Sequence, residues 1–359
     1  MDVRLLYVSI FVVCLFVSIN LDGQKDKSKY WVFLVVACVL LALGAGYRSW
    51  LWMDTYRYID FFCSPQTSTL ETYSIFERPY GYAEKGFYFL SVLAKTISFD
   101  ITFDLLFISA ITMFLLYIDI RKYSIYPLLG LCCYVSRFFC GRNLVQMRAG
   151  MSYLIVLWGL HYVYKRDLLK FFLVVYFASL FHQSAWIALP FYFICNTIEL
   201  KRKHIYQGLV IAFILGAFFQ GPISAFVTDS VTDFDVATTY VQGRYVEAAK
   251  GLKNPMIYFQ TVILLLYVYY EKRIAKHDRY YYVFRNGYWY STLILITFCS
   301  FTTLSGRTSS QFATLEFAII PSILFGLPQK YRSFAYLTMG AVLSFFLWYN
   351  ITLGFRVGL

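Results

Sequence analysis

Three polar side chains interrupt segments of this chain that are otherwise apolar. Arg148 lies in VQMRAGMSYLIVLWGL, His182 in VVYFASLFHQSAWIALP and Arg307 in FTTLSGRTSSQF. An ionisable group at membrane depth is costly, so each one is a candidate functional residue. Guanidinium groups bind phosphate or carboxylate through paired hydrogen bonds, so several arginines around one cavity would suit an anion. The arginines that could form such an anion site are Arg48, Arg142, Arg148 and Arg307.

A single arginine at a membrane edge has a simpler interpretation, because its side chain can extend to the interface. Arg148 fits this interpretation poorly. It lies about one turn inside its predicted helix and precedes two small residues, Ala149 and Gly150.

His182 lies at a break between two short apolar segments, in LFHQSAW. A neutral imidazole can act as a general base or orient a hydroxyl group. Alternatively, His182 is a core histidine that hydrogen-bonds to a neighbouring helix. The sequence leaves both interpretations open.

Two carboxylates, Asp54 and Glu84, flank a long polar segment near the N-terminus. Either could accept a proton from a sugar hydroxyl or hold a sugar by paired hydrogen bonds. Tyr56 and Tyr58 are candidate sugar-binding residues, because aromatic rings can stack on sugars. Solvated loop carboxylates and an interfacial belt of tyrosines are the alternatives.

The composition predicts an all-α polytopic membrane protein. Of 359 residues, 59% are hydrophobic and only 14% are charged, and the mean hydropathy is +0.58. A soluble domain would carry about a quarter charged residues. The apolar runs recur at about the 20-residue length of a spanning helix. We therefore expect one integral membrane domain over residues 1–359, with about 12–13 transmembrane helices. The candidate spans are 3–20, 30–47, 101–118, 124–140, 144–163, 168–182, 184–198, 205–226, 255–270, 285–303, 311–327 and 333–352.

The basic loops predict the orientation of these spans. Clusters of Lys and Arg alternate between loops, and such clusters face the cytoplasm. The run 84–99 is weaker and would break this alternation if it crossed the membrane, so we expect it to be re-entrant or interfacial. Twelve crossings then place both termini outside; thirteen crossings are the alternative. The outer face receives long loops at about 48–83 and 227–254, with short turns at 141–143, around His182 and at 304–310.

The net charge of +12 is mostly the bias of cytoplasmic loops, so nucleic acid is not an expected partner. No phosphate-binding glycine loop, dinucleotide fingerprint or zinc motif is present. Asp233 and Asp235 form a single acidic pair with no other metal-ligand cluster. We expect no metal and no cofactor.

At these residues the chain resembles the EpsG-like branch of the Wzy polymerases, bacterial enzymes that polymerise O-antigen and capsule repeat units. The resemblance covers most of the chain and is best in YRSWLWMDTYRYIDFF, YAEKGFYFLSVLAK, GRTSSQF and the stretch from MRAGMSYL to HQSAWIALPFYF. Met53 departs from a glycine of the family pattern, and Ala149 from a glutamine. The residues that fit the pattern are Arg48, Asp54, Thr55, Tyr58, Glu84, Phe87, Arg148, Phe181, His182, Ser184 and Ala185.

The resemblance implies a GT-C-like glycosyltransferase of the bacterial inner membrane with its active site facing the periplasm. The donor would be an oligosaccharide on undecaprenyl pyrophosphate, transferred to another lipid-linked repeat unit. Arg148 and Arg307, helped by Arg48 or Arg142, would bind the pyrophosphate. His182 or Asp54 would take the acceptor proton and Glu84 would position a sugar. Membrane lipids and a Wzz-type chain-length regulator are the expected partners in lipopolysaccharide biosynthesis.

Other classes of membrane protein remain alternatives. A flippase or transporter would need a polar path through both leaflets. Many transporters also carry an internal repeat, and we see no repeat. A membrane acyltransferase that draws on cytosolic acyl-CoA would place its polar cluster toward the cytoplasm. An O-antigen ligase shares the chemistry, and the sequence offers no clean discriminator against it.

Overall fold

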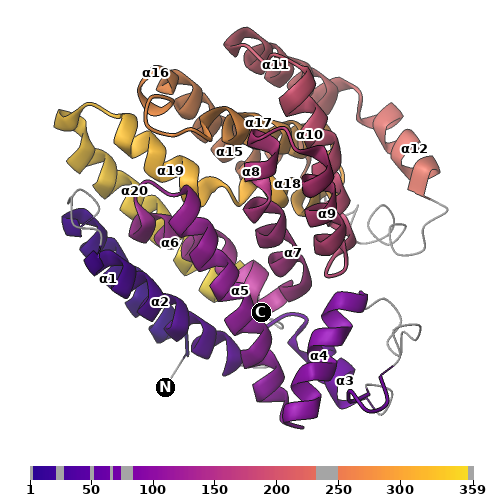
Figure 1. The fold of residues 1–359 in the computed structure, drawn as a ribbon. Helices are drawn as coiled ribbons and strands as arrows, with labels where there is room; N and C mark the ends of the chain where they lie inside the picture. The colour runs from indigo at the N-terminus through magenta and orange to yellow at the C-terminus, as the bar shows by residue number, and fades with distance from the viewer. Residues whose placement is uncertain are drawn as a thin grey trace. The chain divides into compact units, whose positions relative to one another are not determined.

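The computed structural model describes residues 3–21, 28–48, 52–64, 68–73, 84–231 and 250–354. Every regular element in these residues is helical (Figure 1). The chain forms two compact units interleaved along the sequence. Unit 1 contains Met1–Gly159, Leu173–Ala185 and Glu316–Leu359, and unit 2 contains Leu160–Phe172 and Trp186–Leu315. That the whole chain is one membrane domain stays a prediction.

Unit 1 contains both ends of the chain. Figure 1 shows α1 and α2 side by side, and α5 packs against α2. Asp100 caps α5, where its Oδ1 accepts the Thr102 N–H at 2.9 Å. Arg121 and Lys122 in the last turn suit the negative end of the helix dipole. The helices of unit 1 are α1 (Val3–Leu21), α2 (Ser28–Gly46), α3 (Thr55–Cys63), α4 (Lys85–Ile97), α5 (Ile101–Tyr123), α6 (Pro127–Tyr134), the π-helix η1 (Val135–Val145), α7 (Met147–Trp158), α19 (Glu316–Gly326), α20 (Gln329–Tyr349) and the π-helix η4 (Asn350–Gly354).

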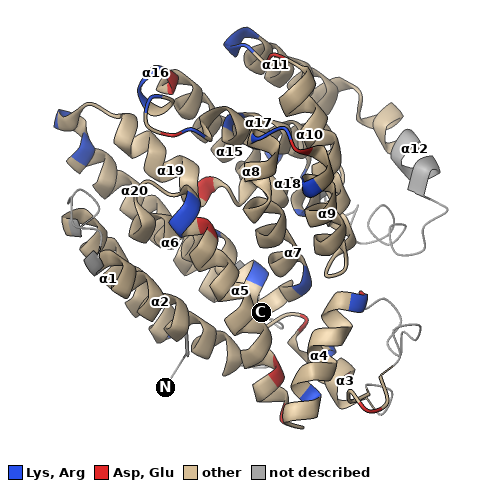
Figure 2. Cartoon of the chain, in the orientation of Figure 1, with Lys and Arg blue, Asp and Glu red and all other residues tan. Residues whose placement is uncertain are grey.

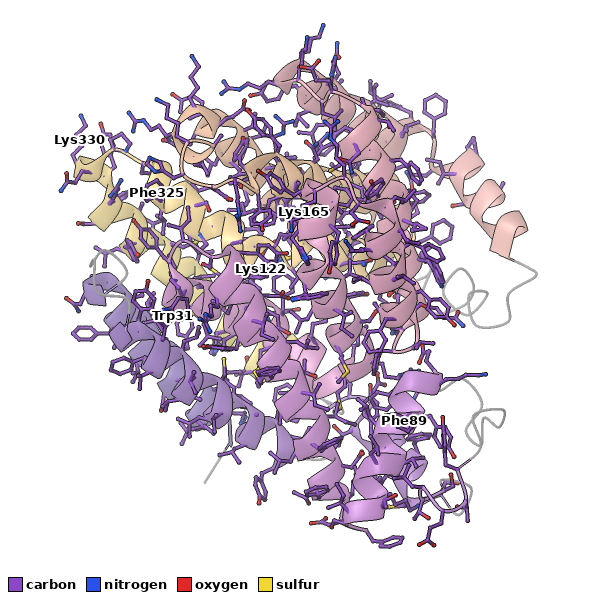
Figure 3. The ribbon with its side chains drawn as sticks, in the orientation of Figure 1. Trp31, Phe89, Lys122, Lys165, Phe325 and Lys330 are labelled. Atoms are coloured by element: carbon purple, nitrogen blue, oxygen red, sulfur yellow. The ribbon has the colours of Figure 1, made fainter. Side chains whose placement is uncertain are left out.

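Two contacts within unit 1 join α5 to α7 and η1 to α19. Lys122, labelled in Figure 3, donates to the carbonyl of Trp158 at the end of α7, at 3.1 Å. Arg137 of η1 forms a buried ion pair with Glu316 at the start of α19, with Nε and Oε2 2.9 Å apart. Glu316 thus ties the C-terminal part of the chain to a helix 179 residues earlier in the sequence.

Unit 2 is built around α17 (Tyr281–Thr297), against which α10, α11, α15 and α18 pack. Its charged residues include Glu271, which binds both Arg202 and Arg285, at 3.2 and 3.3 Å. Two elements, α9 (Leu168–Ser179) and the 3-10 helix η2 (Gln183–Ile187), cross between the units. The other helices of unit 2 are α8 (Leu160–Tyr164), α10 (Ala188–Thr197), α11 (Arg202–Phe218), α12 (Gln220–Val231), η3 (Gly251–Lys253), α15 (Pro255–Tyr269), α16 (Glu271–Ile274) and α18 (Thr302–Ala313).

The helical class is as predicted. Several helices, among them α7, α10 and α19, are shorter than the predicted spans, whereas α1, α2, α5 and α20 are at least as long. By length and composition, two described segments are long and apolar enough to cross a membrane, Ile101–Tyr123 and Gln329–Thr352. Five shorter apolar helices accompany them. The number of crossings stays a prediction. So does the re-entrant character of 84–99, where α4 has 13 residues. A helix of that length measures roughly 20 Å, less than the ~30 Å hydrocarbon core.

The turn predicted at 141–143 was wrong, because these residues continue the π-helix η1. The turn was predicted from the gap between the candidate spans 124–140 and 144–163, but buried partners stabilise the helix here. The Tyr134 hydroxyl donates to Asn143 Oδ1 at 2.9 Å. Arg48 donates to the carbonyls of Asn143 and Leu144 at 2.9 and 2.8 Å.

The turn predicted at 304–310 was also wrong, because these residues lie within α18. Their hydroxyl groups bond back to the helix: Thr308 Oγ1 donates to the Leu304 carbonyl at 2.8 Å. A polar segment can therefore stay helical where its side chains satisfy themselves locally. By contrast, the break predicted around His182 is confirmed, since α9 ends at Ser179 and η2 begins at Gln183.

The predicted outer loops are described only in part. The first, 48–83, contains α3, while residues 49–51, 65–67 and 74–83 lie outside the described residues. The same holds for 232–249 of the second loop, including Asp233 and Asp235.

Candidate active site

The centre of the candidate site is an ion pair between Arg148 and Glu84. Arg148 Nη1 lies 2.6 Å from Glu84 Oε2, and the two side chains are 21% and 12% exposed. A pair that is partly buried but still reachable can exchange partners with a ligand. The backbone of Gln183 also hydrogen-bonds to the Glu84 carboxylate. Burial raises the pKa of Glu84, and the nearby Arg148 guanidinium opposes this rise.

Glu84 reaches Arg148 because the start of α4 docks on the end of α9. The Gly86 N–H donates to the Leu180 carbonyl at 2.7 Å. A Cβ at Gly86 would lie 2.8 Å from that same oxygen, so only glycine allows this approach. From the other side, Ser152 of α7 donates to the Ala178 carbonyl at 3.0 Å. Ser152 follows Arg148 by four residues, so both lie on one face of α7 and approach the same chain turn, the one that follows α9.

His182 lies in this turn, next to Gln183. Its Nδ1 accepts the backbone N–H of Ser184 at 3.2 Å and lies 2.6 Å from Ser184 Oγ. An Nδ1 that accepts a hydrogen bond leaves the proton of the neutral ring on Nε2. In this geometry neutral His182 presents Nε2–H as a donor. The serine also contacts Tyr153, whose hydroxyl lies 3.4 Å from Ser184 Oγ.

Tyr58 and Asp54 approach the site from α3. The Tyr58 hydroxyl donates to the Val145 carbonyl at 3.0 Å, and Tyr58 also interacts with Arg148. Asp54 precedes α3 with φ of 62°, a left-handed conformation that few residues other than glycine adopt, aspartate more often than most. Strained residues of this kind cluster at functional sites. Asp54 lies one helical turn from Tyr58, and its Oδ1 is 3.8 Å from Arg57 Nε.

Two of the predicted arginines, Arg48 and Arg142, contact the protein next to the site. Arg48 is buried and bonds to the backbone carbonyls that end η1, directly before α7 and Arg148. Arg142 donates to Gln146 Oε1. Its guanidinium carbon lies 4.9 Å from the centre of the Tyr153 ring. Arg142 therefore lies beside the His182 turn, whereas Arg48 is occupied by the protein backbone.

Tyr56 and Arg307 are the remaining predicted residues. Tyr56 is 49% exposed, and its hydroxyl accepts a hydrogen bond from Arg57, so it points away from the buried Tyr58. Arg307 belongs to α18 of unit 2, whereas the other residues of the site belong to unit 1.

Sequence reasoning missed three contributors, namely Ser152, Tyr153 and Gln183. Helical spacing could have found Ser152, which lies four residues after Arg148. Nothing local marks Gln183, because its role depends on Glu84, about 100 residues away in sequence. In the part of the chain that the structure describes, no three His, Cys, Asp or Glu residues form a metal-binding group.

These features define a helical membrane protein whose candidate site combines a paired arginine and glutamate with a histidine turn. The model of the EpsG family matches residues 31–355, and the chain belongs to this family. A curated relative, the amylovoran biosynthesis protein AmsC of Erwinia amylovora, is 27% identical over 366 residues, covering 96% of this chain and 90% of AmsC. No solved structure matches the chain.

Proposed function

We propose that this protein is a polysaccharide polymerase that joins oligosaccharide repeat units carried on undecaprenyl pyrophosphate at the periplasmic face of the inner membrane. Family membership and a relative named for amylovoran biosynthesis support the polysaccharide class. The single observation that carries the chemistry is the Arg148–Glu84 pair beside His182.

The reaction joins an acceptor hydroxyl oxygen to the anomeric carbon of the donor sugar. The bond from that carbon to the pyrophosphate oxygen breaks, and undecaprenyl pyrophosphate leaves with the bonding electrons. Arg148 neutralises the charge that develops on the pyrophosphate, an electrostatic role that can supply several kcal/mol. Arg142, beside the same turn, is the second candidate for this role.

Glu84 is the base that this geometry favours. In the free protein Glu84 binds Arg148, and pyrophosphate competes for the same guanidinium. A carboxylate released in a buried place is more basic than one in water. His182 then donates a hydrogen bond from Nε2 to the acceptor or the leaving group. Asp54 is the alternative base, and Tyr58 contributes to sugar binding. Arg48 positions the helix that carries Arg148.

The test is the glycan profile of a deletion strain, with mass spectrometry of its lipid-linked intermediates. We expect core lipid that carries a single repeat unit, restored to polymer by the wild-type gene but not by Arg148→Ala. Polymer left on undecaprenyl pyrophosphate would instead identify a ligase. Repeat units trapped on the cytoplasmic leaflet would identify a flippase, and polymer that lacks only an acyl group would identify an acyltransferase.

A further inference from the structure

Unit 2 carries an apolar groove that the proposed reaction does not use. It has a volume of about 270 Å³ and runs along α10 and α17. Only two of its lining residues, Tyr290 and Thr297, carry a hydroxyl group. The others are Ile194, Ile198, Leu200, Trp289, Leu293, Ile294 and Phe298. A groove with this lining suits a hydrocarbon chain.

Trp289 is a fixed part of the groove wall. Its Nε1–H donates to the Ile205 carbonyl of α11 at 3.1 Å. A Cβ at Gly208 would lie 2.4 Å from the Trp289 ring, so this glycine makes room for the indole between α11 and α17. The wall is therefore set by packing within unit 2.

One end of the groove borders a basic surface. Leu200 lines the groove and is followed directly by the exposed Lys201 and, two residues later, Lys203. Arg285 fixes this segment by donating to the Leu200 carbonyl at 2.5 Å. The ion pair of Arg202 with Glu271 links this segment to α16. Figure 2 marks the Lys and Arg positions of α11 and α16 in blue.

Cations outnumber acids on this basic surface, which comprises the loops around 165–170, 199–204 and 271–279. Its exposed cations are Lys165 (labelled in Figure 3), Arg166, Lys170, Lys201, Lys203, Lys272, Arg273, Lys276 and Arg279. Glu199 is exposed among them. Asp167 is already paired with Lys170, with Oδ2 and Nζ 2.8 Å apart. The surface thus keeps a large positive excess that would attract an anionic group.

The outer side of α11 repeats the same order from charge to hydrocarbon. Lys203 in its first turn is exposed, Tyr206 follows, and the exposed side chains beyond it are Val210, Ile211, Ile214 and Phe218. From Lys203 to Phe218 the helix rises roughly 22 Å. A phospholipid has this same sequence of anionic head, interfacial region and acyl chain.

We propose that unit 2 binds an anionic glycerophospholipid, with its phosphate at Lys201 and Lys203 and an acyl chain in the groove lined by Trp289. The basic surface supplies the charge complementarity, and the groove that it borders supplies the contact for the chain. A free phosphate has no hydrocarbon chain to fill the groove. A neutral lipid has no net negative charge to attract the lysines. This site is independent of the polymerase proposal.

The test measures tryptophan fluorescence of the purified full-length protein in nanodiscs that contain lipids brominated on the acyl chain. The Trp289 signal is the difference between wild type and Trp289→Phe. Brominated phosphatidylglycerol should quench this signal at about one tenth of the mole fraction that brominated phosphatidylcholine requires. Lys201→Gln/Lys203→Gln should remove the preference. The control Arg121→Gln/Lys330→Gln, which removes two exposed charges of unit 1, should keep it.

Equal quenching by the two brominated lipids would overturn the proposal. Loss of the preference in the control variant would overturn it as well, because the effect would then reflect net charge. If equimolar undecaprenyl phosphate restored the Trp289 emission, the occupant would be a polyprenyl lipid and the proposed ligand would be wrong. Inorganic phosphate at millimolar concentration should not change the quenching.

Discussion

At the scale of single residues, the candidate site depends on which partner each charged side chain binds. Arg148 is partly exposed and bound by a carboxylate that a ligand can replace. Arg48 is buried against backbone carbonyls, and Arg137 is buried against Glu316. Arg148 is the most exposed of these three arginines, although all three have the same charge in sequence.

Arg148→Lys tests whether the shape of the guanidinium matters. Lysine keeps the charge but cannot form the forked contact with pyrophosphate or carboxylate. We expect kcat for polymerisation to fall by roughly 10²-fold, as for loss of one donor to a developing anion. The assay is polymer length from purified protein and lipid-linked repeat units. Wild-type kcat in this variant would remove Arg148 from the mechanism.

Ser184→Ala tests the orientation of His182. The variant loses the hydroxyl beside Nδ1 but keeps the backbone N–H. We therefore expect the activation free energy to rise by about 1 kcal/mol, which is roughly a fivefold loss of kcat. The pH profile of kcat should shift as well, because the hydroxyl acts on the imidazole. Ser184→Thr should restore both, whereas an unchanged profile in Ser184→Ala would contradict the orienting role.

At the scale of elements, close approach between helices sets the site. The start of α4 touches the end of α9 through Gly86, and α7 touches the same turn through Ser152. Three segments of the chain therefore place Glu84, Arg148 and His182 together. Neither of these two contacts involves a charged residue, so this part of the docking does not depend on the Arg148–Glu84 ion pair.

Gly86→Ala should separate α4 from the turn. The added Cβ meets a backbone oxygen, and such overpacking costs roughly 1–3 kcal/mol. A displacement approaching 1 Å at a reacting group can cost about 10²-fold in rate. The measurement is kcat together with the melting temperature in detergent. Gly221→Ala is the control, since a Cβ there meets nothing within 4 Å. Equal kcat in both variants would contradict the docking argument.

Asp278, between α16 and α17, should make stability pH-dependent. Burial raises the pKa of Asp278 to about 6, although the Tyr280 N–H bonds its carboxylate and lowers it. The folded state therefore prefers the protonated acid. Protonated Asp278 therefore adds up to ~3 kcal/mol to the free energy of unfolding. This contribution is complete below about pH 4 and is lost as pH rises through 6. Asp278→Asn should flatten the melting temperature between pH 4 and 7. Glu199→Gln, at an exposed site, should leave the slope unchanged.

At the scale of the whole molecule, unit 1 is assembled from segments at both ends of the chain. The helices α19 and α20 return to pack with α6 and η1. The Arg137–Glu316 pair joins these parts, and the Arg137 guanidinium also lies 4.6 Å from the Phe346 ring centre. The pair therefore stabilises unit 1.

Arg137→Met should destabilise the protein by about 3–5 kcal/mol, because it leaves Glu316 charged and buried. Glu316→Gln should act similarly, and the double variant should lose less than the sum of the two. Thermal unfolding in detergent measures all three. Additive losses would mean that the two side chains do not depend on each other.

The sequence alone determined the helical class and the break at His182 and singled out Arg148 as a candidate, because apolar runs and interrupting charges are local patterns. The family resemblance was also readable in these motifs. The sequence prediction of turns at 141–143 and 304–310 was wrong. Arg48 and Tyr134 stabilise the first segment as a helix, and hydroxyl groups that bond back to the helix stabilise the second. Only the tertiary structure decided the partners: Glu84 is 64 residues from Arg148, and Glu316 is 179 residues from Arg137. Which charge meets which depends on how distant helices pack, and that packing energy is summed over many apolar contacts that no short motif records.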